Sequence, residues 1–233
     1  MNLIQIDNFQ TSNEILFVLD SISKNAGKSL SKLGLQKILY LAKVLEPIKE
    51  IIINTLEFLT EKRGPYSKEI QNLIDHLTAL GFVSITDFKV IVGKNSLAYY
   101  EITPVGERVV KKLKKIPLQE EKYWWIDVIS RLTIVYSNKV ELEDDNKFYD
   151  LDRIVRLVYQ DPSYNLFKQN NNWKYNIDFE KQDENSTSWI IDFVKTYVTD
   201  NNLTLSQKSI KGNAELITIA FFEYYFLNYL KSK

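Results

Sequence analysis

The sequence lacks cysteine altogether and contains a single histidine, His76. Without cysteine there is no disulfide framework, thiol nucleophile or cysteine zinc site, which fits a chain that stays in a reducing compartment. Zinc and non-haem iron sites normally need two or more imidazoles or thiolates, so one histidine does not predict such a centre. No serine–base arrangement accompanies His76. We therefore expect no metal, no cofactor and no enzymatic activity.

Long apolar runs and glycine-rich loops are also missing. The longest apolar stretches, at 51–53 and 217–222, are far shorter than the roughly 20 residues needed to span a bilayer. The N-terminus has no basic segment followed by an apolar one. The seven glycines are scattered and form no phosphate loop, dinucleotide fingerprint or nucleophile elbow. We expect a cytoplasmic protein with no membrane partner.

Charge is balanced overall but unevenly distributed. Residues 1–115 hold 16 Lys and Arg against 12 Asp and Glu, and residues 116–233 hold 14 against 18, giving +4 and −4. The first half can face an anion, although committed nucleic-acid binders usually show a pronounced basic stripe. The acidic run Glu141, Glu143, Asp144 and Asp145 lacks the spacing of a calcium loop, which favours a solvated loop.

Two helical patterns open the chain. Thr11 and Ser12 are suitable N-caps for a first helix that breaks at 25–27, and a second helix ends near Pro47. The segment 48–60 fits either a strand or a helix, and its type stays open. The stripe of the second helix consists of Leu33, Gln36, Lys37, Ile38, Tyr40 and Leu41.

A turn and a third helix follow. Gly64-Pro65 predicts the turn, Ser67 can cap the helix, and Gly81 can end it in the left-handed conformation. Between these signals, apolar residues recur every three or four positions and predict one buried face. This face comprises Ile70, Leu73, Ile74, Leu77 and Leu80.

The period then changes to that of a β-hairpin. β-branched and aromatic residues predict strands at 82–92 and 97–102 around a turn. Thr103-Pro104 predicts the start of another helix, which ends in lysines and is closed by Pro117. Helix, helix, turn, helix, hairpin and helix is the order of a winged helix-turn-helix. The predicted fold class is mainly α with a small β-hairpin wing (α+β).

The second half is expected to be mostly helical. An irregular stretch at 161–186 includes a short candidate strand at 173–177. We predict a winged-helix domain at 1–117 and a mostly helical C-terminal domain at 118–233. The helical candidates lie at 123–135, 151–159, 189–198 and 214–230.

The third helix occupies the position of a recognition helix. Its polar face carries side chains that can read bases or meet phosphate, but Glu69 and Asp75 would lie close to phosphates. A solvated or partner-binding face fits the same residues. The candidate contacts to DNA or a partner are Lys62, Arg63, Lys68, Gln71, Asn72, Lys89 and Lys94.

Aromatic residues crowd the last predicted helix. Adjacent helix positions lie about 100° apart, so these rings cover more than one face. Such a helix is either central in its domain or docked on a partner. The candidate partner interface comprises Phe221, Phe222, Tyr224, Tyr225, Phe226 and Tyr229.

Three segments of the first half carry a family resemblance. They are GLQKILYLAK, FLTEKRGPYSKEIQNLIDHLTALGFV and YYEITPVGERV. They resemble winged-helix proteins in which Gly-Pro-Tyr-Ser introduces a helix and Tyr-x-Ile/Leu-Thr-x-x-Gly ends the wing. LQKILYLA is also similar to the start of Panacea-type antitoxin domains, and the whole order resembles middle components of ABC-three-component and Lamassu-type anti-phage systems. This resemblance implies a small subunit that restrains a larger effector.

Three functional hypotheses follow. The first is a non-catalytic accessory or regulatory subunit of a prokaryotic defence or toxin-antitoxin-like complex, docked on a larger ATPase, nuclease or toxin. The second is a winged-helix DNA-binding transcriptional regulator, with a homodimer formed through the C-terminal helices. The third, a carboxylate-dependent nuclease, rests on the acidic run at 141–145.

Overall fold

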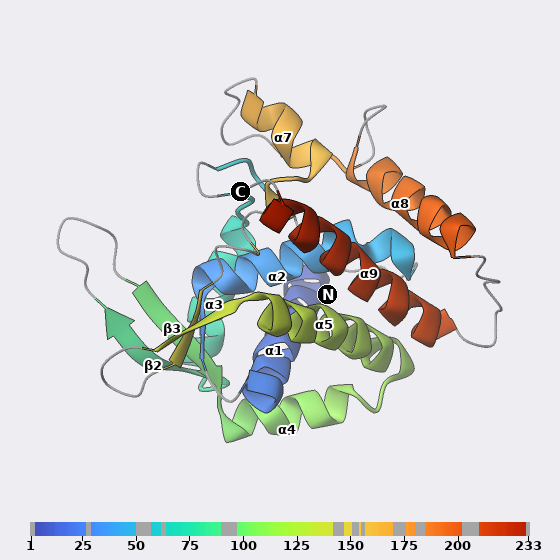
Figure 1. Cartoon of the computed structure of the whole chain (residues 1–233). Coiled ribbons are helices and arrows are strands. Elements are labelled where there is room, and N and C mark those ends of the chain that lie inside the picture. Colours follow the sequence, from blue (N-terminus) through green and yellow to red (C-terminus); the bar gives the residue numbers. More distant parts are fainter. Residues whose placement is uncertain are drawn as a thin grey trace.

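The computed structural model is mainly helical with a small antiparallel sheet, which confirms the predicted fold class (Figure 1). It describes residues 3–26, 29–49, 57–61, 64–89, 97–141, 147–150, 154, 157–169, 176–179, 185–201 and 210–231. The turn of the first hairpin, Lys62, Arg63 and Lys94 lie outside these residues, as do Glu143, Asp144 and Asp145.

The described part of the first half contains four helices and the main sheet. The helices are α1 (Leu3–Ala26), α2 (Lys32–Val44), α3 (Lys68–Ala79) and α4 (Pro104–Leu113), with a short 3-10 turn, η1 (Glu46–Ile48), after α2. The strands are β1 (Leu30–Ser31), β2 (Val83–Lys89) and β3 (Leu97–Ile102), arranged in the order β1-β3-β2. The β2–β3 hairpin projects away from the helices (Figure 1).

The described part of the second half adds four helices and a second hairpin. The helices are α5 (Pro117–Tyr136), α7 (Pro162–Gln169), α8 (Ser186–Asp200) and α9 (Ile210–Lys231). The strands β4 (Asn138–Glu141) and β5 (Lys147–Asp150) pair with each other. The stretch 161–186, expected to be irregular, contains α7, and the β4–β5 hairpin was not predicted.

The sequence predicted the ends of the central helices well. Ser67 Oγ accepts a hydrogen bond from the Ile70 amide, and Thr103 Oγ1 accepts one from Gly106, as expected of N-caps. Gly81 follows α3 with a φ of +76°, in the left-handed region. The predicted start of α1 was wrong: this helix already includes Leu3, and Ser12 Oγ donates to the Asn8 carbonyl inside it.

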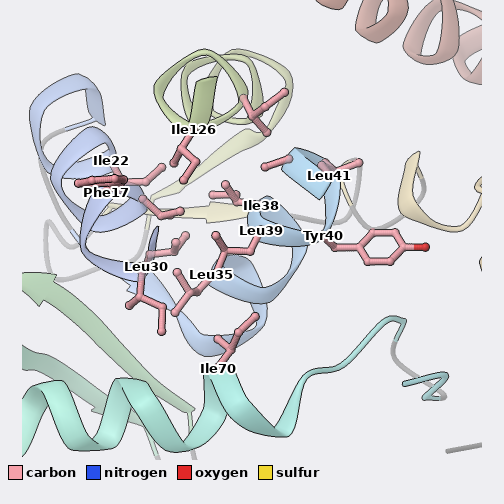
Figure 2. Packing of buried hydrophobic residues seen from close by; sticks show 14 of the residues in the cluster. Phe17, Ile22, Leu30, Leu35, Ile38, Leu39, Tyr40, Leu41, Ile70 and Ile126 are labelled. Carbon is pink, nitrogen blue, oxygen red and sulfur yellow. The ribbon is translucent and has the colours of Figure 1, made fainter. Parts of the chain in front are cut away.

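One continuous apolar core joins the two halves of the chain. α5 packs against α1 and α2, and Ile126 of α5 belongs to the same buried cluster as Phe17 and Ile38 from those helices (Figure 2). Trp125 is fully buried and donates its indole N–H to the Ala42 carbonyl of α2. Pro117 both follows α4 and occupies the first turn of α5. The core therefore continues across residue 117, and the division there into two domains remains a prediction.

Candidate functional site

A buried glutamine fixes α3 relative to α2. The Ser67 amide donates to Gln36 Oε1 at 2.8 Å, and Gln36 Nε2 donates back to the Ser67 carbonyl at 3.3 Å. Both residues are buried. Because the amide side chain satisfies backbone groups of the turn, it holds the start of α3 in place. The outer face of the helix is thereby presented on a rigid support.

The outer face of α3 is polar, as predicted. Lys68, Asn72, Asp75 and His76 are exposed, and Gln71 is half-buried. The inner face buries Ile70, Ile74 and Leu77, but Leu80, which the periodicity placed in the core, is largely exposed.

Asp75 on this face does not stand alone. Lys32 Nζ donates to both of its carboxylate oxygens, at 2.7 and 2.9 Å. Lys32 also lies 5.5 Å from the centre of the Tyr100 ring in β3. Of the two carboxylates on this helix that disfavour DNA contact, that of Asp75 is therefore paired with a lysine of the same chain.

The β2–β3 hairpin carries apolar residues beyond the core. The pairs Val83–Ile102 and Ile85–Tyr100 share one face, and Val83, Tyr100 and Ile102 are buried. Ile85, on the same face but further out, is 50% exposed.

A register shift extends this apolar face. It lies between Ile85 and Asp87, so Phe88, opposite Ala98, returns to the core side while Asp87 turns away. Phe88 is 57% exposed. Ile85, Phe88 and Ala98 thus form a continuation of the core surface, here named the hairpin face. Lys89 belongs to β2, but its side chain is not among those described.

A fully buried lysine lies under the Gly64-Pro65 turn. Lys37 of α2 donates from Nζ to the Pro65 carbonyl at 2.9 Å. Gly64 has a φ of +97°, and a Cβ there would come within 2.3 Å of Lys37 Nζ. Burial lowers the pKa of Lys37 to about 7. The sequence placed Lys37 in the apolar stripe of α2, and that position was the only signal of its burial.

A buried carboxylate joins α2 to the C-terminal half. Asp161 accepts hydrogen bonds from the Tyr40 hydroxyl, the Ser186 hydroxyl and the Ser163 amide. Burial raises the pKa of Asp161 to about 6, although these hydrogen bonds act in the opposite direction. Because its partners come from α2, α7 and α8, Asp161 acts as a structural junction, which no local sequence pattern indicated.

Three of the four aromatic side chains of α9 that the structure describes are turned at least partly toward the chain's own core. Phe221 and Phe222 are buried, and Tyr225 is half-buried with its hydroxyl accepting from the Trp189 indole of α8. Tyr224 is 54% exposed. Phe226 and Tyr229 lie in α9, but their side chains are not described. In this fold a partner would meet Tyr224, whereas Phe221 and Phe222 are covered.

Metal ligands do not cluster in the described part of the chain. No group of three or more His, Asp or Glu side chains there is placed to hold an ion. Among the same residues, no helix combines the length and apolarity needed to cross a membrane.

Comparison with known proteins gives no family assignment. No protein-family model matches the chain, and no curated protein matches it.

Proposed function

We propose that the chain is a non-catalytic accessory subunit that docks on a larger protein through the hairpin face. The supporting observation is that the apolar core side of the main sheet continues outward as uncovered surface at Ile85 and Phe88. Exposed apolar patches commonly mark protein interfaces. The larger subunit would be an ATPase, nuclease or toxin of a prokaryotic defence or toxin-antitoxin-like complex, as the resemblance implies.

Three buried polar side chains, those of Lys37, Asp161 and Gln36, support a non-catalytic role. Lys37 bonds a backbone carbonyl, and Asp161 joins three helices. Gln36 is paired with Ser67 on both of its amide atoms. These groups hold elements together, which is the expected use of satisfied polar side chains in a core.

The edge position of β2 adds to the docking surface. Within the described residues β2 pairs only with β3, so its outer edge leaves backbone N–H and C=O groups open to a partner strand. An apolar face beside an open edge offers both side-chain and main-chain contacts.

The test is reconstitution with the products of neighbouring genes. Each product is co-expressed with this chain, and a complex is isolated by affinity capture and size-exclusion chromatography. Ile85→Thr/Phe88→Thr keeps strand-forming residues. Burial of the exposed halves of these two side chains contributes about 2 kcal/mol, so we expect roughly 30-fold weaker binding.

The matched control is Val135→Ala/Leu216→Ala. Both of these residues are exposed, on α5 and α9, and alanine suits a helix. The control variant should bind as the parent does. A chain that stays monomeric with every neighbouring product, or equal losses in both double variants, would contradict the docking role.

A second candidate is a winged-helix DNA-binding regulator that uses the outer face of α3. The neutralisation of Asp75 by Lys32 favours it, because it removes an unpaired negative charge from the candidate reading face. A mobility shift on the gene's own upstream DNA, repeated across salt concentrations, separates the two functions. The regulator should hold one specific site, and Lys68→Ala/Asn72→Ala should abolish that preference.

A further inference from the structure

The exposed side of α4 carries a row of positive charges. Arg108, Lys111 and Lys112 lie on α4, and Lys115 follows just after its end. All four are exposed, and their spacing of three or four residues places them on one side of the helix. The opposite side is buried through Gly106, Val110 and Leu113.

These four cations are not compensated within the described residues. No hydrogen bond or ion pair there joins any of them to a carboxylate, and Glu107 is the only acidic residue of α4. Lys114 behaves differently: its Nζ lies 3.6 Å from the centre of the Tyr123 ring. The helix dipole favours Lys111 and Lys112 in the last turn, but it acts little on Arg108 in the middle of the helix. Helix stability alone therefore does not explain the row.

We propose that this row, residues Arg108, Lys111, Lys112 and Lys115, binds the phosphate backbone of a nucleic acid. Seven helical rises of about 1.5 Å give a length of about 10 Å. Along a duplex, each strand presents a phosphate about every 3.4 Å of axis, so the row spans about three such spacings and meets about four phosphates. The cationic side of α4 therefore matches a ligand whose negative charges are regularly spaced along a line.

The distribution of apolar residues favours nucleic acid over the other anionic partners. Protein interfaces centre on buried aromatic or aliphatic anchors, and membrane-surface helices insert a broad apolar face. Here the exposed apolar residues Val105, Ile116 and Leu118 lie before and after the row, and the centre is cationic. The row lies on a different helix from the outer face of α3 and outside the two strands of the hairpin face.

The test measures binding of the whole chain to a labelled 30-base-pair DNA duplex by fluorescence anisotropy from 50 to 200 mM NaCl. With about four phosphate contacts, the logarithm of the association constant should fall against log[salt] with a slope of about −3.6. Arg108→Gln/Lys112→Gln removes two contacts while keeping good helix formers. It should reduce the slope by about 1.8 and weaken binding about 60-fold at 0.1 M salt.

The matched control, Lys195→Glu, lowers the net charge by the same two units at an exposed lysine of α8. It should retain the parent slope and affinity to within a few-fold. Thermal unfolding of each variant checks that the fold is kept.

Every other outcome is decisive as well. Equal losses in both variants would assign binding to net charge, and an unchanged Arg108→Gln/Lys112→Gln variant would place binding elsewhere; either result would overturn the proposal. Binding of anionic lipid vesicles or polyglutamate without binding of nucleic acid would also overturn it. An RNA duplex in a parallel arm shows which nucleic acid supplies the phosphates, and preference for either one supports the proposed site.

Discussion

Replacing Lys37 by methionine tests how the core holds the turn before α3. Lys37 is fully buried, and burial lowers its pKa from 10.5 to about 7. Between pH 7 and pH 10.5 the unfolded chain binds a proton at this lysine that the folded chain does not. Burial of Lys37 therefore lowers the free energy of unfolding most below pH 7. This loss of stability becomes smaller as the pH rises to 10.5.

The magnitude follows from the two pKa values. At about 1.36 kcal/mol per pKa unit, the burial penalty is at most about 4 kcal/mol at pH 7 and below about 1 kcal/mol at pH 10. Lys37→Met removes this penalty but leaves the Pro65 carbonyl without the Nζ donor, at a cost of about 1–3 kcal/mol. The variant should be more stable than the parent by about 1–3 kcal/mol at pH 7. At pH 10 the variant should be as stable as the parent or less stable.

The assay is urea denaturation of parent and Lys37→Met at both pH values. Tyrosine titration at pH 10 affects both proteins and cancels in the difference. Lys68→Met, at an exposed lysine of α3, is the control and should show no change in its difference with pH. A stability difference between parent and Lys37→Met that stays constant from pH 7 to 10 would refute the burial of a neutral amine.

Two further changes probe the junctions between elements. Burial raises the pKa of Asp161 from 3.8 to about 6, so its contribution to stability should improve by about 2 kcal/mol as the pH falls from 7 to 4. Asp161→Asn should lack this improvement in urea denaturation, and an identical pH response in both proteins would contradict the burial of the carboxyl. Lys122 of α5 faces the buried Glu14 of α1 at 3.1 Å, so Lys122→Met should cost about 3–5 kcal/mol in thermal or urea unfolding. Glu14→Leu/Lys122→Met should recover most of that loss, and a double variant as unstable as the single one would show that the ion pair is not the cause.

Local signals predicted the middle of the chain because each one acts over a few residues. Ser67 and Thr103 accept hydrogen bonds from backbone amides three residues ahead, and Gly81 adopts a left-handed conformation. The sequence alone therefore indicated where α3 begins and ends and where α4 begins. The start of α1 was missed because Thr11 and Ser12 are good caps by type, whereas tertiary packing carries the helix through them.

The sequence alone did not predict those features of the candidate surfaces that depend on contacts between distant residues. The register shift that returns Phe88 to the core side depends on pairing with β3, and alternation alone would have placed Asp87 there. Burial of Phe221 and Phe222 depends on α5 and α8, which are distant in sequence. The sequence predicted that the helix now labelled α4 ends in lysines. It did not predict that they are exposed together on one side, because that depends on the packing of α4 on α1.

Hydrogen–deuterium exchange on the reconstituted complex tests the docking role most directly. Adding the partner should slow exchange in peptides that cover β2 (Val83–Lys89), because its edge amides and the side chains of Ile85 and Phe88 become covered. Peptides of α8 (Ser186–Asp200) should be unchanged. Protection confined to α8, α9 or the outer face of α3, with β2 exchanging as in the free chain, would contradict the proposal.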